Sequence, residues 1–488
     1  MLWYRRAMSL TRAESDALYA SGPDAVFAAL AQQAAQVAAL TARVAALEAQ
    51  LGGHSQNSHR PPSSDGPRQP PRSQRTRSGK APGGQPGHPG HTLAMTDTPD
   101  QVVTHHPEQC AHCGAALAGV PAAAVVRRQV VDLPPLRLAV TEHQAAAVCC
   151  PHCQRPTTAP FPPEAARAIQ YGPRLLGLGV YLRHYQLLPY QRIGELLADL
   201  FGRGPSGGTL HAASLTCAAA LVGVEAAIKT ALGAAPLAHA DETSVVVAGQ
   251  RRWVHVVSTA WLTHYAWHAQ RGHAATDAIG ILPAFSGRLI HDGWVPYWHY
   301  GCRHGLCNAH HLRELTAVAE QAGQGWATQL HALLVEMKRH ADQGRAAGHA
   351  TSPPAGCAPF VARFRVLLAE GYAANPPPVR TPDGPRRGRL KQGKARNLLA
   401  RLATREDEVL AFVHDWAVPF DNNQAERDLR MIKVQQKISG TFRDAAGADA
   451  FCRIRGYIST LRKQARQVLT ALEQAFLGHP PMPTLLPE

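Results

Sequence analysis

The chain has 488 residues, enough for roughly two to four domains with at least one sizeable core. It carries 50 Lys and Arg against 35 Asp and Glu, a formal net charge of +15, which favours a polyanionic partner such as nucleic acid over a merely solvated basic surface. No apolar run reaches the roughly 18 residues of a transmembrane helix, the N-terminus lacks a long apolar signal region, and ten cysteines are too few for a disulfide scaffold. These features predict a cytoplasmic protein with no membrane partner.

The N-terminal segment, residues 1–51, is predicted to contain one helix over residues 24–51. Apolar residues recur along it at heptad spacing: Leu30, Val37, Val44 and Leu51 at one position, and Leu40 and Leu47 three residues after two of these. Such a seam requires a partner helix to bury it, so we expect a short coiled coil and a homo-oligomer. An Ala-rich helix that packs on its own protein is the alternative.

Residues 52–104 are rich in Pro, Gly, Ser and Arg and contain almost nothing apolar to bury. This composition predicts a basic linker, flexible or partly polyproline II. Its Arg and Lys side chains can contact phosphates without a fixed structure, but a passive tether would have the same composition.

Residues 105–160 hold two CxxC pairs, Cys110 with Cys113 and Cys150 with Cys153. Two such pairs are typical of a structural zinc site with four thiolate ligands, which would organise a small domain that lacks its own core. Other ligands could substitute for one of the four: Cys149, His112 or His152. Four cysteines without a metal are the alternative.

Residues 161–235 are predicted to be helical. One helix ends at Gly202, and Ser206 is a suitable N-cap for the next, so the segment matches a helix-turn-helix pattern that could bind DNA. Most such patterns are ordinary helical hairpins.

Residues 236–436 are predicted to form an α/β core. Three runs rich in β-branched and aromatic residues come first, SVVVAG, RRWVHVVSTA and LTHYAWHAQ, followed by the helical stretch TDAIGILPAF and the strand RLIHD. A helical insertion is expected at about 320–415, and a helical tail at 437–488.

Two acidic residues lie at predicted strand ends, Asp241 at the start of one strand and Asp292 at the end of another. Two such side chains on neighbouring strands could share a divalent cation, for which oxygen ligands favour Mg²⁺ or Mn²⁺. Either residue alone could instead cap a turn.

A third acidic residue, Glu426, lies on a helix whose predicted N-cap is Asp421 or Asn422. Three cations follow it on the same helix face: Arg430, Lys433 and Lys437. The pattern fits a metal ligand flanked by phosphate contacts, but spacing alone favours a solvated ladder of ion pairs.

Four sequence blocks resemble transposases of the IS66 insertion-sequence family: HADET, IHDGW, CNAHHLREL and VPFDNNQAERDLRMIKVQQKISGTFR. The run FCRIRGYISTLRKQARQVLTAL resembles the same family's C-terminal tail, and the order of segments matches over nearly the whole chain. The resemblance implies a multidomain α/β protein with an RNase H-like catalytic core and a DDE triad.

Residue by residue, the resemblance assigns the triad to Asp241, Asp292 and Glu426, with Asp421 read as the helix cap. It implies DNA transposition: metal-dependent cleavage at the ends of a mobile element, followed by strand transfer into target DNA. Accessory proteins of the element and a nucleoid-associated place in a bacterial cytoplasm are implied as well.

The same family shows a Cys, a His three residues later and a following basic residue, matched here by Cys307, His310 and Arg313. A second metal site would need two more ligands, and Cys302 and His304 are near in sequence. Alternatively, His310 and Arg313 face the active site and contact DNA, or the Cys and His are simply buried.

Two other functions are consistent with parts of the chain. A non-catalytic, zinc-containing DNA-binding regulator would use the same upstream segments, but it has no need for all three acids. Another RNase H-like nuclease would keep the acids, but it has no need for the zipper-like helix and the cysteine pairs.

Overall fold

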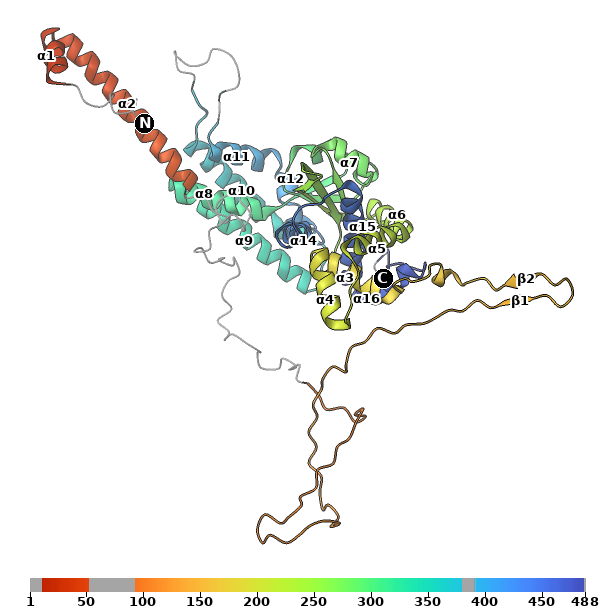
Figure 1. Ribbon diagram of the computed structural model, residues 1–488. Coiled ribbons are helices and arrows are strands. Elements are labelled where there is room, and N and C mark those ends of the chain that lie inside the picture. The colour runs from red at the N-terminus through yellow and green to blue at the C-terminus, as the bar shows by residue number, and fades with distance from the viewer. Residues whose placement is uncertain (1–10, 52–92, 380–389, 391, 487–488) are drawn as a thin grey trace. The chain divides into compact units, whose positions relative to one another are not determined.

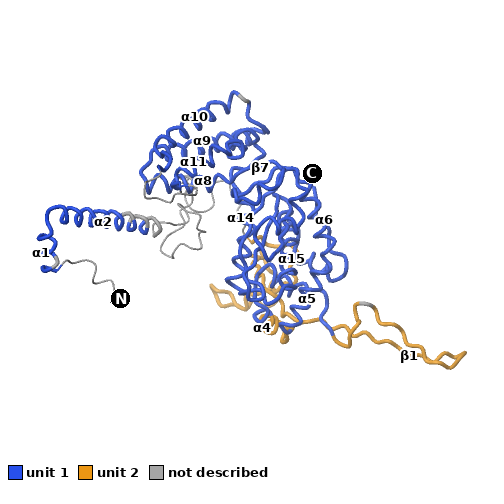
Figure 2. Tube along the Cα trace, turned by 90° about the horizontal axis from the view of Figure 1, so that it is seen from above, with its two compact units in different colours: residues 1–71, 170–193, 206–488 blue, residues 72–169, 194–205 orange. Residues whose placement is uncertain are grey.

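The computed structural model describes residues 11–51, 93–379, 390 and 392–486 (Figure 1). Most of the predicted linker, residues 52–92, lies outside the described residues. The chain divides into two compact units (Figure 2). The described residues of unit 1 come from residues 1–71, 170–193 and 206–488, and those of unit 2 from residues 72–169 and 194–205.

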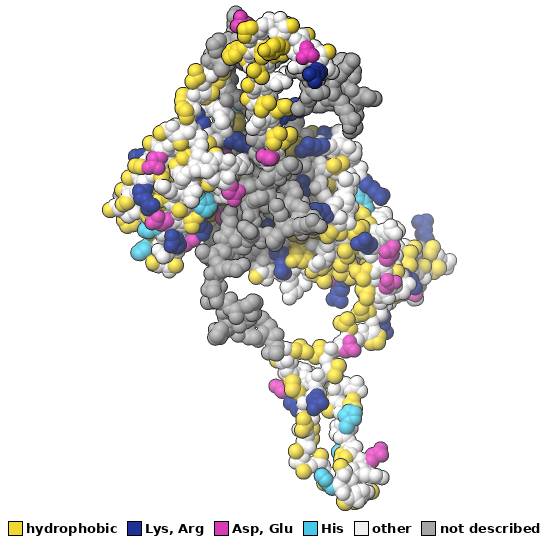
Figure 3. All heavy atoms as spheres, turned by 90° about the vertical axis from the view of Figure 1, so that its left-hand side faces the viewer, with side chains coloured by type: hydrophobic (Ala, Val, Ile, Leu, Met, Phe, Trp, Pro, Cys, Tyr) yellow, Lys and Arg dark blue, Asp and Glu magenta, His cyan; other side chains and the backbone are white. Residues whose placement is uncertain are grey.

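The N-terminal segment forms two helices, α1 (Arg12–Ala20) and α2 (Pro23–Leu51). The predicted long helix is confirmed. Five of its heptad residues are exposed, from 50% for Leu47 to 62% for Val37: Leu30, Val37, Leu40, Val44 and Leu47. Hydrophobic side chains accordingly lie on the surface of this segment, at the top of Figure 3.

Unit 2 contains little regular secondary structure. The strands β1 (Ala147–Cys149) and β2 (Pro156–Thr158) form an antiparallel pair, and a single bridge joins Gln109 to Ala116. A short 3-10 helix, η3 (Pro163–Ala165), follows.

A five-stranded mixed sheet lies at the centre of unit 1, in the order β5-β4-β3-β6-β7. Its strands are β3 (Leu237–Val247), β4 (Gln250–Ser258), β5 (Thr263–His268), β6 (Arg288–His291) and β7 (Arg303–Leu306). The first three are antiparallel, while β6 and β7 continue the sheet in parallel with β3. The hairpin turn between β3 and β4 uses Ala248 and Gly249, both with positive φ, as a two-residue turn of this hand requires.

The sheet departs from the sequence prediction in two ways. β3 begins at Leu237, so Asp241 lies within the strand and not at its start. β7 was not predicted, because four residues with no apolar alternation carry no strand signal. The predicted stretch TDAIGILPAF folds as α7 (His273–Ile279) and the 3-10 helix η4 (Leu282–Ala284), and a further 3-10 helix, η5 (Val295–His299), follows β6.

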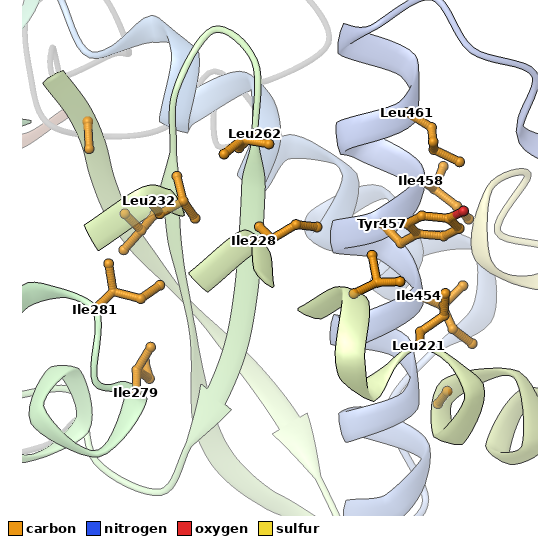
Figure 4. Close-up of a cluster of buried hydrophobic side chains, with 14 of the residues drawn as sticks. Leu221, Ile228, Leu232, Leu262, Ile279, Ile281, Ile454, Tyr457, Ile458 and Leu461 are labelled. Atoms are coloured by element: carbon orange, nitrogen blue, oxygen red, sulfur yellow. The ribbon is translucent and has the colours of Figure 1, made fainter. Parts of the chain in front are cut away.

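Helices that precede the sheet in the sequence and helices that follow it pack together in the larger hydrophobic core of unit 1. Those before it are α3 (Pro173–His184), α5 (Gly207–Ala220) and α6 (Val222–Gly233), and those after it are α15 (Ala445–Lys463) and α16 (Val468–Phe476). Most of α4 (Tyr190–Phe201), which follows α3 in sequence, belongs to unit 2. α15 packs along β5, and α16 packs on α3. Figure 4 shows Ile454 and Ile458 of α15 in one buried cluster with Leu221 and Ile228.

This shared core changes the predicted domain organisation. The C-terminal region contains the predicted helices, as α15 and α16, but these are part of the core and not a separate tail, because α15 supplies one wall of it. The predicted helical segment also contributes to the core through α3, α5 and α6. The N-cap Ser206 is confirmed, since its Oγ accepts the Thr209 N–H at 3.2 Å. However, α5 buries a full face against the core, so the helix-turn-helix role stays an untested prediction.

A second hydrophobic core holds the helical insertion together. It comprises α8 (Asn308–Ala322), α9 (Gly325–Ala346), α10 (Pro354–Ala374), α11 (Lys394–Thr404), α12 (Glu406–Val409) and α13 (Ala411–His414). The insertion thus starts near residue 308, earlier than predicted. The chain then returns to the sheet as α14 (Asn423–Ser439), which packs on β3 and β4.

Among the described helices, none is by itself long and apolar enough to cross a membrane. Taken together, α5 and α6 are long and apolar enough for a span, but they are bent by 52° relative to one another. Both helices bury residues in the core of unit 1.

Candidate active site

The register of the sheet places Asp241 beside Asp292. β3 pairs with β6 in parallel, with Leu237 opposite Arg288 and His239 opposite Ile290, so partners differ by 51 residues. Asp292 also follows Asp241 by 51 residues, two positions beyond the last of these pairs. Because partners in parallel register point to the same side of a sheet, the two carboxylates share one face at the end of the β3–β6 ladder.

Both aspartates have one oxygen engaged by a backbone N–H. Asp292 Oδ1 accepts the N–H of Trp294 at 2.8 Å and so caps the turn after β6, where Gly293 has a φ of +91°. Asp241 Oδ1 accepts the N–H of Glu242 at 2.8 Å. The turn-capping interpretation and the metal-ligand interpretation of Asp292 are therefore compatible, because capping uses one carboxylate oxygen of two.

Asn422 fixes the start of α14 against β3. Its Nδ2 donates to the carbonyl oxygen of Ala240 at 2.9 Å, and its Oδ1 accepts from Nδ1 of His239 at 2.8 Å. Asn422, and not Asp421, is the N-cap residue of α14. Asp421 precedes it, and its Oδ1 accepts the N–H of Asn423, the first residue of the helix. This attachment, one residue from Asp241, places the first turn of α14 and its Glu426 next to the aspartates.

The charges of Asp292 and Glu426 both act on Asp241. Burial raises the pKa of Asp241 well above its ordinary value, and the negative charges of Glu242, Asp292 and Glu426 raise it further. Burial also raises the pKa of Glu426, while the nearby Arg313 guanidinium opposes the shift. A cation bound between Asp241 and Glu426 would offset the burial that raises the pKa of both residues.

Glu242 is a buried acid beside the site that sequence reasoning missed. Its Oε2 accepts the Tyr297 hydroxyl at 2.6 Å, and its Oε1 accepts from Nε and Nη2 of Arg271 at 2.9 and 2.6 Å. The Arg271 guanidinium in turn stacks over the rings of Trp253 and Trp294. This network ties β3 to Tyr297 in the segment that follows Asp292. The sequence signal that could have identified Glu242 is its position next to Asp241 in the HADET motif.

Cys307 and His310 join the site from the start of α8. Cys307 Sγ, a ring nitrogen of His310 and a carboxylate oxygen of Glu426 all lie within 4.8 Å of one another. Within the described ranges this is the one group of three potential ligands that lie so close together. The carboxylate oxygens of Asp241, Asp292 and Glu426 are therefore not all within 4.8 Å of one another. His304 interacts instead with His291, and Cys302 with His304, so neither completes a site with Cys307.

The predicted DNA-contacting cations differ in what they contact. Arg313 and Arg430 lie close enough to Glu426 for their positive charges to oppose the rise in its pKa that burial causes. Lys437 is exposed near the end of α14. Lys433 donates from Nζ to the carbonyl oxygen of Ser244 at 2.7 Å, so its ammonium group holds α14 against β3.

The sequence matches the family model described as "Transposase IS66 family" over residues 168–450, more than half of the chain. The chain belongs to the IS66 family of transposases. Residues 107–154 match the zinc-finger binding domain of transposase IS66, and residues 9–94 match a family of unknown function. A comparison with curated proteins gave no match. The mixed sheet with its helices is consistent with the RNase H-like core of a DDE transposase.

Each cysteine pair of the IS66 zinc-finger segment forms a turn of its own. The N–H of Gly114 donates to the carbonyl oxygen of Cys110, and that of Gln154 to the carbonyl oxygen of Cys150. Hydrogen bonds from the backbone within each turn lower the pKa of Cys110 and Cys150, which favours the thiolate that a metal requires. The four sulfurs are not gathered into one group in the described structure.

Proposed function

We propose that this IS66-family transposase cleaves the ends of its element and joins them to target DNA, using Asp241, Asp292 and Glu426 as the catalytic acids. The observation that carries the proposal is that the register of β3 and β6 brings Asp241 beside Asp292, while Asn422 holds the start of α14, which carries Glu426, against β3. The three acids come from a strand, a turn and a helix separated by as many as 185 residues. A structural role does not require such a meeting, because clustered carboxylates destabilise a fold.

The donor set fits a hard divalent cation. Carboxylate oxygens are the ligands that Mg²⁺ and Mn²⁺ prefer, and Asp292 and Asp241 each retain an oxygen beyond the one that accepts a backbone N–H. Such cations, when bound, would activate a water or a 3′-hydroxyl and stabilise the departing 3′ oxygen.

The protein's own residues would bind and orient the DNA. Arg313 and Arg430, near Glu426, would hold phosphates beside the acids, and the exposed Lys437 would extend this contact along α14. We leave Lys433 out of this set because Ser244 already engages it. The Asn422 and Glu242 contacts would keep the acids in place during the reaction.

A cell-based excision assay tests the triad, with the element's ends and any accessory genes supplied. Asp241→Asn, Asp292→Asn and Glu426→Gln should each abolish excision while the purified variants still bind DNA that carries the ends. Asp407→Asn, an exposed acid on α12, is the matched control and should excise normally. Normal excision by Asp241→Asn would refute the triad, and a wild type that binds DNA without excising would support the regulator alternative.

Two further parts of the proposal concern the upstream segments. We infer that the four cysteines of the IS66 zinc-finger segment hold one structural Zn²⁺, which would bring the two turns together and help the segment contact DNA. We also infer that α2 pairs with α2 of a second copy, because its heptad seam is exposed and apolar.

A further inference from the structure

Two helices begin at the same point beside the proposed catalytic acids. Cys307 is the N-cap residue of α8, and Asn422 is the N-cap residue of α14. The backbone N–H of Asn422 donates to Cys307 Sγ at 3.1 Å, which joins the two helix starts directly. The positive ends of both helix dipoles therefore meet at the sulfur. Burial and the negative charge of Glu426 nevertheless raise the pKa of the Cys307 thiol to about 12, so a cation that binds here must displace the thiol proton.

The spacing on each helix directs a side chain to this point. The N–H of His310 donates to the carbonyl oxygen of Cys307 in a tight turn, so the two side chains, three residues apart, lie on one face. Glu426 lies in the first turn of α14, four residues after Asn422. The result is the group of sulfur, nitrogen and oxygen atoms within 4.8 Å of one another described above.

This combination of ligands differs in kind from the carboxylates. A thiolate and an imidazole select borderline or soft cations such as Zn²⁺ over Mg²⁺. Three protein ligands with a fourth position open to solvent are typical of non-structural zinc sites. Cys307 is buried, but His310 and Glu426 are half-buried, so a cation can reach the group from their side.

We propose that Cys307, His310 and Glu426 form a second cation site, which binds Zn²⁺ or a cation of similar chemistry. The site shares Glu426 with the proposed triad, and its functional consequence rests on that proposed function: a cation held here withdraws Glu426 from the Mg²⁺ site and inhibits DNA cleavage. Binding itself does not depend on the triad assignment. The positive charges of Arg313 and Arg430 lie near Glu426 and weaken cation binding, so this site should be weaker than one with four thiolates.

Cobalt titration of the full-length protein tests the site, since a thiolate bound to Co²⁺ gives a charge-transfer band in the near ultraviolet. The chain is first loaded with one equivalent of zinc, which the tighter site of four cysteines takes up, and Co²⁺ is then added to fill the weaker site. The wild type should show the band with about one further cation per chain. Cys307→Ser should abolish the band, and His310→Ala should weaken the apparent affinity at least about 10-fold.

Cys302→Ser is the matched control, because Cys302 is also buried but lies outside the group. It should keep the band, as should Asp241→Asn, whose behaviour separates this site from the triad. Circular dichroism checks that each variant is folded, and the half-buried His310 provides a test even where Cys307→Ser fails to fold. Absence of the band from the wild type would overturn the proposal, and so would a band unchanged in both Cys307→Ser and His310→Ala.

Discussion

At the residue scale, the acids of the site work against the stability of the fold. Asp241 is surrounded by Glu242, Asp292 and Glu426, and burial and these charges raise its pKa. A carboxyl group whose pKa is higher in the folded chain binds its proton more tightly there. Its contribution to stability is therefore greatest at low pH, and it is lost as the pH rises from the unfolded to the folded pKa.

We therefore predict that Asp241→Asn stabilises the metal-free protein near neutral pH by ~1 kcal/mol, a gain within the range of single stabilising substitutions. The melting temperature measured by calorimetry should rise, and the difference from the wild type should shrink as the pH is lowered through the raised pKa. Added Mg²⁺ should narrow the gap, since it stabilises the wild type more. A variant less stable than the wild type at neutral pH would contradict this account.

At the scale of elements, α14 organises the site. Its N-terminus is attached to β3 through Asn422, and its middle through the contact of Lys433 with Ser244. On its other side, Asp428 accepts from Nζ of Lys463 on α15 at 2.9 Å, with both side chains nearly buried. These contacts fix the helix axis, and the position of Glu426 relative to the sheet follows from them.

Asn422→Ala should therefore damage both stability and catalysis. It removes the partners of His239 and of the Ala240 carbonyl, and leaving buried polar groups unsatisfied costs about 1–3 kcal/mol. Urea denaturation measures the loss, and excision should fall while DNA binding persists. Asn423→Ala is the matched control, because Asn423 is the next residue in the chain and its side chain is exposed. Equal effects of the two substitutions would show that Asn422 does not position α14.

At the scale of the whole molecule, helix α2 carries an apolar seam that no other described part of the chain buries. Leu30, Val37, Leu40, Val44 and Leu47 of α2 are each at least half exposed. A monomer rarely leaves such a stripe in water, and a second copy of α2 would bury it in heptad register.

Leu40→Glu should therefore shift the protein toward the monomer, because it places a charge within the apolar seam. Light scattering coupled to size-exclusion chromatography measures the change in mass. Ala35→Glu adds the same charge to the same helix outside the seam and should leave the mass unchanged. A mass that is identical for wild type and Leu40→Glu would place the oligomer contact elsewhere.

The sequence by itself determined the local features whose causes are local. Heptad spacing predicts α2, the Ser206 cap predicts the start of α5, and β-branched runs predict β3, β4 and β5. The family motifs pointed to the IS66 transposases, which the family match confirms. The three acids were also named from sequence, but Glu426 could not be separated from an ion-pair ladder by helix spacing alone.

Only the tertiary structure decided which of these features meet. The register offset of 51 residues between β3 and β6 sets Asp241 beside Asp292, and no pattern within either strand contains that offset. The attachment of Asn422 to β3 and Cys307 depends on contacts 115 to 183 residues apart, which are set by the packing of the whole insertion. Likewise, the C-terminal helices have the amphipathic pattern of any surface helix, and only packing against α3, α5 and β5 makes them part of the core. Local pattern specifies an element, whereas a site depends on long-range packing.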